Sequence, residues 1–156
     1  MVKAKIKSTS LKNDTYRGNK MAKATPRSKC LLAIQLLSRV AGADDEGYCT
    51  CASCGDQFHY KDGDGGHFIA KGHSSYWSLE VENVHPQCKG CNGFGMKFGT
   101  ASQQYTIFMI DMYGKEFVDN MIATKKTPIK MYKADYVDML KGFNELIKYH
   151  KERIGE

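Results

Sequence analysis

Residues 49–97 read CTCASCGDQFHYKDGDGGHFIAKGHSSYWSLEVENVHPQCKGCNGFGMK and hold five of the six cysteines and four of the five histidines. Two Cys-x-x-Cys pairs frame this stretch, Cys51 with Cys54 and Cys88 with Cys91. Two thiolates three positions apart on a tight turn can face one ion, and two such turns complete the tetrahedral sulfur site that zinc prefers in structural roles. We therefore predict one structural zinc ion bound by these four cysteines.

The other cysteines leave two alternatives to this ligand set. The sequence has no export signal and no apolar run of membrane length, so we expect a soluble, intracellular protein. Six cysteines could form three disulfides, but Cys-x-x-Cys spacing in such a protein favours metal binding. Cys49 lies two positions before Cys51 and could replace it as the partner of Cys54. We assign Cys51 because Cys-x-x-Cys is the usual knuckle spacing, and we expect Cys30 to be packed on the apolar side of a helix.

The positive charge of the chain is concentrated at its N-terminus. Residues 1–29 hold nine of the 23 Lys and Arg residues and one of the 17 acidic residues, which gives this segment +8 and leaves −2 for the remainder. The segment has few large apolar side chains, so it cannot bury enough surface to offset the entropy of ordering. We predict a flexible basic arm at residues 1–25, followed by one domain at residues 26–156. Such an arm either contacts DNA phosphates or serves as a solubilising tail.

Helical spacing of apolar residues predicts helices on both sides of the cysteine-rich stretch. Pro26 suits the first position of a helix that should end near Gly42. Gly114 and Pro128 should stop two later helices. These two helices are predicted at residues 105–113 and 117–122. A last, longer helix is predicted from Lys133 to about Arg153.

The apolar residues of the last predicted helix form a seam with steps of three and four residues. Its members are Tyr136, Leu140, Phe143, Ile147, His150 and Ile154. Such a seam is typical of helices that pack along their length. It packs either on the zinc core or on a second copy of the chain, which would make a homodimer.

Between the cysteine pairs, the sequence predicts a β-hairpin with strands at residues 57–60 and 67–70. Residues 61–66 are rich in glycine and aspartate, which is typical of a turn. Residues 89–98 can begin a short helix despite their glycines. A hairpin followed by a helix, with zinc clamping both ends, is a ββα-metal arrangement, and the chain as a whole is predicted to have an α+β fold.

Two strings resemble the phage lambda NinG/Rap recombination endonuclease family, a branch of the HNH nucleases: GGHFIAKG at residues 65–72 and ENVHPQCKGCNGF at residues 82–94. The likeness covers roughly residues 41–98 and extends more weakly into the C-terminal helices. It implies a zinc-stabilised ββα-metal core of HNH, treble-clef-like type with surrounding α-helices. It also implies a phage DNA endonuclease that acts in the host cytoplasm on branched recombination intermediates. Spacing alone shows no preference for branched DNA.

The resemblance assigns roles to four residues. His67 matches the first histidine of the HNH motif and is the expected general base, since a neutral imidazole accepts a proton near pH 7. Asp64 and Asn92 match positions that offer oxygen ligands, and they are expected to hold a catalytic Mg²⁺ or Mn²⁺. Asn83 matches the middle asparagine of the motif, and it is expected to fix the loop by hydrogen bonds to the backbone.

The sequence departs from the common motif just before the expected base. Gly66 stands where many HNH enzymes have a carboxylate or a histidine. The nearest carboxylate is Asp64, with Asp62 as a less suitable substitute. One carboxylate and one amide make a weak cation site, so substrate phosphate is expected to complete it.

Candidate DNA contacts lie close to these residues. Lys71, Lys89 and Lys97 are suited to phosphate, although lysines beside a helix can equally be solvated without a partner. His85 could contact phosphate, complete the metal site or pack against the zinc knuckle. A competing class of function is a non-catalytic zinc module that binds nucleic acid or protein, which requires the cysteines but not His67.

Overall fold

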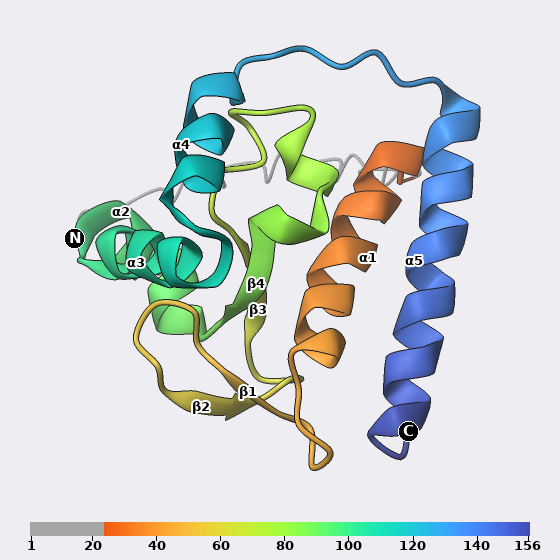
Figure 1. Ribbon diagram of the computed structural model, residues 1–156. Helices are drawn as coiled ribbons and strands as arrows, with labels where there is room; N and C mark the ends of the chain where they lie inside the picture. Colours follow the sequence, from red (N-terminus) through yellow and green to blue (C-terminus); the bar gives the residue numbers. More distant parts are fainter. Residues whose placement is uncertain (1–23) are drawn as a thin grey trace, which may run out of the picture.

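The computed structural model describes residues 24–156, so nearly all of the basic arm predicted at residues 1–25 lies outside the described part. The described chain has an α+β fold in which two small antiparallel sheets lie among helices (Figure 1). The strands are β1 (Tyr48–Thr50), β2 (Gln57–His59), β3 (Asp64–His67) and β4 (Val84–Gln87). The longer helices are α1 (Pro26–Ala41), α3 (Ala101–Tyr113), α4 (Lys115–Thr124) and α5 (Lys133–Arg153).

Short helical turns complete the order of elements. Two 3₁₀ turns, Trp77–Leu79 and Val81–Asn83, lead into β4. After β4, a π-helical turn at Cys91–Gly95 continues into α2 (Met96–Phe98), so the short helix predicted at residues 89–98 exists with a widened first turn. No helix within residues 24–156 is both long and apolar enough to cross a membrane.

The helices α1 and α5 run side by side and in the same direction (Figure 1). As predicted, α1 has Pro26 at its first position, and the Thr25 side chain caps it by accepting a hydrogen bond from the backbone N–H of Ser28 (3.1 Å). Gly42 follows the last residue of α1 and donates its N–H to the Ser38 carbonyl (3.0 Å). Both predicted ends of this helix are therefore confirmed.

The apolar seam predicted along the last helix is used within the chain. Phe143 and Ile147 of α5 are buried in one cluster with Ile34, Leu37 and Val40 of α1. The seam residues Tyr136, Leu140 and Ile154 pack against the same cluster. In the described chain, the seam therefore packs against the rest of the domain.

The β-hairpin predicted between the cysteine pairs is wrong in its strand partners. β2 pairs with β1 across the first cysteine pair, and β3 pairs with β4. In the second sheet, Asp64 lies opposite Gln87 and His67 lies opposite Val84. Residues 64–66, half of the segment predicted as a turn, belong to β3, and of the strand predicted at residues 67–70 only His67 lies in a strand.

Two glycines explain why β3 has a turn-like sequence. A Cβ on Gly65 would lie 2.5 Å from the backbone of Gln35 in α1, and a Cβ on Gly66 would lie 1.8 Å from Oε1 of Gln87. Contacts this close leave no space for a side chain, so β3 needs glycine because of its neighbours rather than because it turns.

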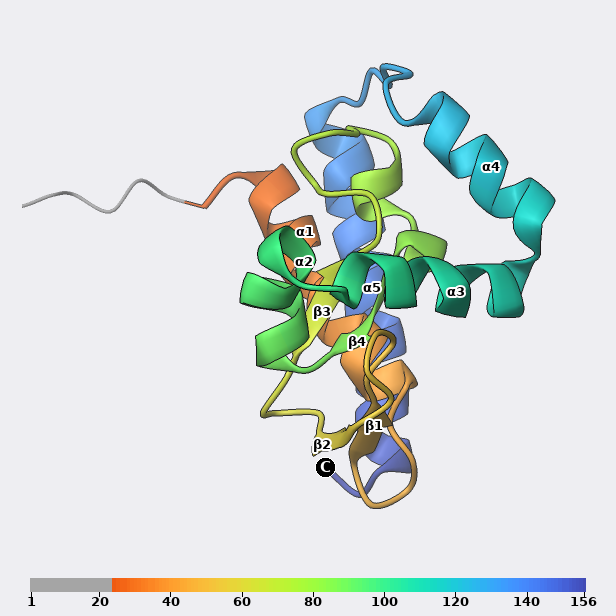
Figure 2. The ribbon, with the colours of Figure 1, turned by 90° about the vertical axis from the view of Figure 1, so that its left-hand side faces the viewer.

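A second core lies on the other side of β3 and β4. Four residues of α3 and α4 are buried there with Ile69 and Trp77: Tyr105, Met109, Val118 and Met121. The indole N–H of Trp77 donates to the hydroxyl of Thr124 in α4 (3.0 Å). In Figure 2, α3 crosses in front of the small sheet, whereas α1 and α5 lie behind it. The sheet of β3 and β4 is therefore held between two helical layers.

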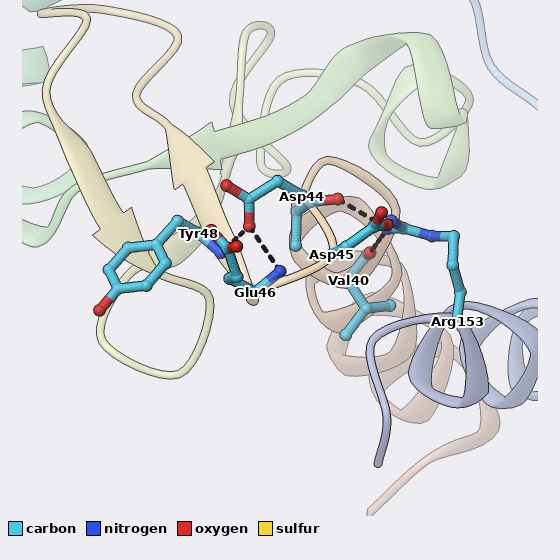
Figure 3. Close-up of polar contacts among 7 residues, drawn as sticks. Val40, Asp44, Asp45, Glu46, Tyr48 and Arg153 are labelled. Atoms are coloured by element: carbon cyan, nitrogen blue, oxygen red, sulfur yellow. Dashed lines mark hydrogen bonds and ion pairs between the residues drawn. The ribbon is translucent and has the colours of Figure 1, made fainter.

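The end of α5 is tied to the turn that follows α1 (Figure 3). Arg153 pairs with Asp45 (3.0 Å) and donates to the backbone carbonyls of Val40 (3.1 Å) and Ala43 (2.6 Å). Asp44 closes the same turn, because its carboxylate accepts hydrogen bonds from two following backbone N–H groups (2.8 and 3.0 Å). This turn leads directly into β1 and so fixes the approach to the first cysteine pair.

Candidate metal and nucleic-acid site

The four cysteines predicted to bind zinc lie together. Their sulfur atoms, from Cys51, Cys54, Cys88 and Cys91, are all within 4.8 Å of one another. The sulfurs of Cys54 and Cys88 are 3.9 Å apart. A tetrahedral ion with zinc–sulfur bonds of about 2.3 Å requires sulfur–sulfur distances of roughly 3.8 Å. The four side chains are therefore close enough together to bind one structural zinc ion.

The two cysteine pairs reach this point from different elements. Cys51 and Cys54 occupy the turn between β1 and β2, which closes with a hydrogen bond from the Gly55 N–H to the Cys51 carbonyl (3.0 Å). Cys88 follows β4, and Cys91 begins the π-helical turn. The N–H of Cys88 also points at the sulfur of Cys51 (3.4 Å), a contact that favours a thiolate at this position. A shared ion would thus link both sheets to the short helix.

The remaining two cysteines are packed away from this cluster. The Cys49 thiol is buried and donates to the Arg39 carbonyl (3.1 Å), and burial raises its pKa to about 11. The Cys30 thiol is also buried and donates to the Tyr136 carbonyl (3.1 Å). Both thiols are therefore held in their neutral form by the core, and the choice of Cys51 over Cys49 agrees with the geometry.

Asn83 is fully buried and organises the loop after β3. Its Oδ1 accepts a hydrogen bond from the N–H of Ile69 (2.7 Å), and its Nδ2 donates to the carbonyls of Ile69 (3.0 Å) and Trp77 (2.9 Å). Three bonds to the backbone hold this loop against the start of β4. This is the supporting geometry expected for the middle asparagine.

His67, at the end of β3, has one ring nitrogen fixed by the backbone. Its Nε2 lies 3.0 Å from the carbonyl oxygen of Ser78. A carbonyl can only accept, so Nε2 carries the proton and Nδ1 keeps its lone pair. Burial lowers the pKa of His67, helped by the positive charges of Lys71 and Arg27. The ring is therefore neutral near pH 7, with one nitrogen able to accept a proton.

Asp64 and Asn92 meet between β3 and the π-helical turn. The Asn92 Nδ2 donates to one carboxylate oxygen of Asp64 (3.1 Å), and Nζ of Lys89 lies 3.7 Å from the other. This contact favours Asp64 over Asp62 as the carboxylate of the candidate cation site. It leaves the Asn92 amide oxygen as a second possible ligand. Lys89 supplies the positive charge beside this carboxylate in the described structure.

Asp64 and His67 project from opposite faces of β3. Side chains alternate along a strand, and Gly65 faces α1 whereas Gly66 faces the side chain of Gln87. His67 thus shares the α1 face, while Asp64 shares the face that carries Asn92. The two candidate groups are separated by about 10 Å along the strand at ~3.3 Å per residue. Among the described residues, Asp64 is brought to Asn92, and His67 is held apart from both.

His85 is packed rather than presented to solvent. It is 8% exposed, and its two ring nitrogens lie 3.0 Å from the hydroxyl of Tyr105 and 2.9 Å from the hydroxyl of Tyr113. Burial lowers its pKa to about 4. These contacts favour the packing alternative for His85 over a phosphate contact. Lys71, Lys89 and Lys97 are exposed, and Lys89 also lies 3.7 Å from Asp64.

Three residues that support these histidines were missed from the sequence. Ser78 and Arg27 act on His67, and Tyr105 also donates its hydroxyl to the Gly66 carbonyl (2.8 Å). In the sequence, Tyr105 is only the first residue of a predicted helix. The local spacing of these residues carries no signal for such contacts, because their partners lie in other elements.

One of the comparisons with known proteins covers nearly the whole chain. A family model described as Bacteriophage Lambda NinG protein matches residues 3–153. No curated protein and no solved structure matches the chain. The matched residues include both cysteine pairs and every candidate site residue described above. The chain therefore belongs to the bacteriophage lambda NinG protein family.

Proposed function

We propose that this protein is a metal-dependent DNA endonuclease of HNH type, acting on branched recombination intermediates in the host cytoplasm. In this proposal β3, β4 and the helical segment Cys91–Phe98 are the ββα-metal core. The observation that carries it is the state of His67, whose Nε2 is anchored on a backbone carbonyl (3.0 Å) while its pKa is lowered. A neutral imidazole with a fixed tautomer is what a general base requires.

His67 would act on a water molecule in line with the scissile bond. Nδ1 takes a proton from the water, the water oxygen forms a bond to phosphorus, and the bond from phosphorus to the 3′ oxygen breaks. A positioned base of this kind contributes on the order of 10²–10⁴-fold to the rate. Asn83 supports this arrangement by holding the loop through three backbone hydrogen bonds.

Asp64 and Asn92 are the residues that would hold a divalent cation. Mg²⁺ or Mn²⁺ bound there would neutralise charge on the phosphate and on the leaving oxygen. The only cluster of three or more potential ligands from His, Cys, Asp and Glu within residues 24–156 is the cysteine cluster. The cation site therefore has one carboxylate and one amide, and substrate phosphate oxygens are expected to complete it. A cation at Asp64 would share this carboxylate with Lys89, whose Nζ lies 3.7 Å from it, or would replace Lys89 there.

DNA binding would draw on the basic arm and on the exposed lysines Lys71, Lys89 and Lys97. Each phosphate neutralised by a lysine releases condensed counterions, which makes affinity fall with salt. A homodimer through α5 stays a further proposal. Its interface would have to use residues outside the seam, such as the exposed Val137 and Tyr149.

The test is cleavage of linear, flapped and four-way DNA with Mg²⁺ by wild type, His67→Ala and His73→Ala. His73 is exposed, so its variant is the matched control. We expect His67→Ala to lose at least about 10²-fold in rate, with unchanged zinc content and thermal stability. His73→Ala should cut like wild type.

Cleavage by His67→Ala at the wild-type rate would overturn the nuclease assignment. The competing function, a non-catalytic zinc module that binds nucleic acid or protein, would then apply. One observation favours it: Asp64 and His67 project from opposite faces of β3. Retention of DNA binding by a protein that cuts none of the three substrates would identify that module.

A further inference from the structure

Two aromatic rings stand exposed on the segment that carries Asn92. Phe94 and Phe98 are each 72% exposed, more than any other large apolar side chain in residues 24–156. Their ring centroids are 4.9 Å apart with an interplanar angle of 42°. They therefore form one apolar surface, which we call the Phe94–Phe98 pair.

The fold places this pair outward by using the opposite side of the helical segment for packing. Asn92 reaches Asp64 (3.1 Å), and the sulfur of Met96 lies 3.5 Å from the Gln87 amide nitrogen and packs on the second core. Residues four apart share a helix face, so Asn92 and Met96 define an inner face and the Phe94–Phe98 pair an outer one. In both ribbon views α2 lies at the periphery of the molecule (Figures 1 and 2).

Packing among residues 24–156 does not account for two phenylalanines at these positions. A phenylalanine carries about 150–250 Å² of mostly apolar surface, and leaving two of them in water is unfavourable. An exposed apolar patch of this kind marks a site of interaction. Both rings are 72% exposed, so no other described residue covers them.

The surroundings of the pair identify the chemistry of its partner. Lys97 directly precedes Phe98 and is exposed, whereas Lys89, at the start of the same segment, lies beside Asp64. A cation next to aromatic rings suits a polyanion whose bases can stack on the rings, as in proteins that bind single strands. The exposed apolar side chains of the neighbouring helix α3 have no aromatic ring, namely Ile107, Ile110 and Met112. They lack the flat faces that base stacking requires.

We propose that the Phe94–Phe98 pair is a stacking platform for unpaired bases of DNA, such as those at a branch point or a flap. This rests on the proposed function and would give it a preference for branched substrates. The pair and Asn92 lie on opposite sides of one helical turn, roughly 10–12 Å apart.

The experiment measures DNA binding rather than cleavage. Phe94→Ala/Phe98→Ala and Phe94→Leu/Phe98→Leu are compared with wild type in Mg²⁺-free buffer without chelator, which leaves the structural zinc in place. The control is Ile107→Ala/Ile110→Ala on α3. The ligands are a blunt duplex, a flapped duplex and a flap with 2-aminopurine at its first unpaired base.

We expect both phenylalanine variants to bind the flapped duplex roughly 10- to 100-fold more weakly than wild type, in line with the energy of base–aromatic stacking. Affinity for the blunt duplex should change less than about twofold. Wild type, but neither variant, should quench the 2-aminopurine fluorescence. The leucine variant separates stacking from general apolar contact, because leucine keeps the apolar surface and loses the ring.

Equal losses on blunt and flapped DNA, or wild-type binding by the leucine variant, would overturn the platform. A wild-type dimer that the alanine variant cannot form in sedimentation would overturn it too, and would assign the pair to self-association. Binding is scored without cleavage, so a failure here differs from a failure of the His67→Ala assay. If only the nuclease proposal holds, the protein cuts DNA but does not quench the 2-aminopurine fluorescence. If only the platform proposal holds, the protein quenches the fluorescence but does not cut DNA.

Discussion

His67 and His85 are both neutral near pH 7, for different structural reasons. His67 keeps one nitrogen free, whereas His85 has both nitrogens at tyrosine hydroxyls inside the core. From the sequence, both could be named as candidate site histidines, and the role of His85 stayed open. Their partners lie 11 to 28 positions away, in other elements. The type of residue is readable from the sequence, but the partner that decides its chemistry is not.

The low pKa of His85 makes the free energy of unfolding depend on pH. The pKa is about 4 in the folded protein and about 6.5 in an unfolded chain. On acidification the unfolded state therefore takes up the proton first, so stability falls as pH drops from about 6.5 to about 4. At 1.36 kcal/mol per pKa unit the total loss is roughly 3 kcal/mol. Above pH 6.5 this contribution is constant.

Urea unfolding of wild type, His85→Gln and the exposed control His73→Gln at pH 7 and pH 4.5 measures this effect. We expect the stability gap between wild type and His85→Gln to shrink by roughly 2–3 kcal/mol at the lower pH. Zinc release and the lowered pKa of His67 affect all three proteins alike, so the gap isolates His85. A gap of the same size at both pH values would contradict the assignment.

At the scale of elements, helices were predictable and strand partners were not. A helix makes its hydrogen bonds locally, so apolar spacing and the stops at Gly42 and Gly114 were enough to find α1 and α3. Strands need a partner, and β3 takes β4 from beyond an intervening loop. The glycines of β3 look like a turn in the sequence. They are needed because Gln35 and Gln87 lie too close for a side chain, and the local sequence does not reveal these contacts.

Gly65→Ala should weaken the contact between α1 and β3. The added Cβ would lie 2.5 Å from backbone atoms of Gln35, which cannot move without shifting α1. Overpacking of this kind costs about 1–3 kcal/mol in the free energy of unfolding. The control is Gly72→Ala, where a Cβ meets open space. Denaturant unfolding that gives the same stability for both variants would mean that β3 is not pressed against α1.

At the scale of the whole molecule, the cysteine cluster connects β1–β2, β4 and the short helix. Structural zinc can contribute about 10–16 kcal/mol of apparent binding free energy, against a typical domain stability of about 5–15 kcal/mol. Cys88→Ser should therefore lose zinc and cooperative unfolding, whereas Cys49→Ser should keep both, because Cys49 lies outside the cluster. Metal analysis of the folded fraction gives the answer, and equal zinc content in the two variants would contradict it.

The basic arm supplies a prediction about salt. Deletion of residues 2–23 removes seven Lys and Arg residues and leaves Thr25, which caps α1. If about five of them meet phosphates, the slope of log K against log salt should become shallower by roughly 4–5. Cleavage at saturating DNA should stay close to that of the full chain, because the candidate site lies outside the arm. An unchanged affinity and slope would identify a solubilising tail.

The pairing of α1 with α5 also sets an order of events during synthesis. The contacts from Cys30 to Tyr136 and from Val40 to Arg153 span 106 and 113 residues, whereas all four zinc cysteines have been made by residue 91. Zinc can therefore bind to the four cysteines before α5 has been made and can pack on the apolar face of α1. Exposed faces of this kind favour aggregation of incomplete chains. A nascent chain halted before Lys133 would combine a finished metal centre with an uncovered helix, so release of α5 from the ribosome is the step that protects the protein.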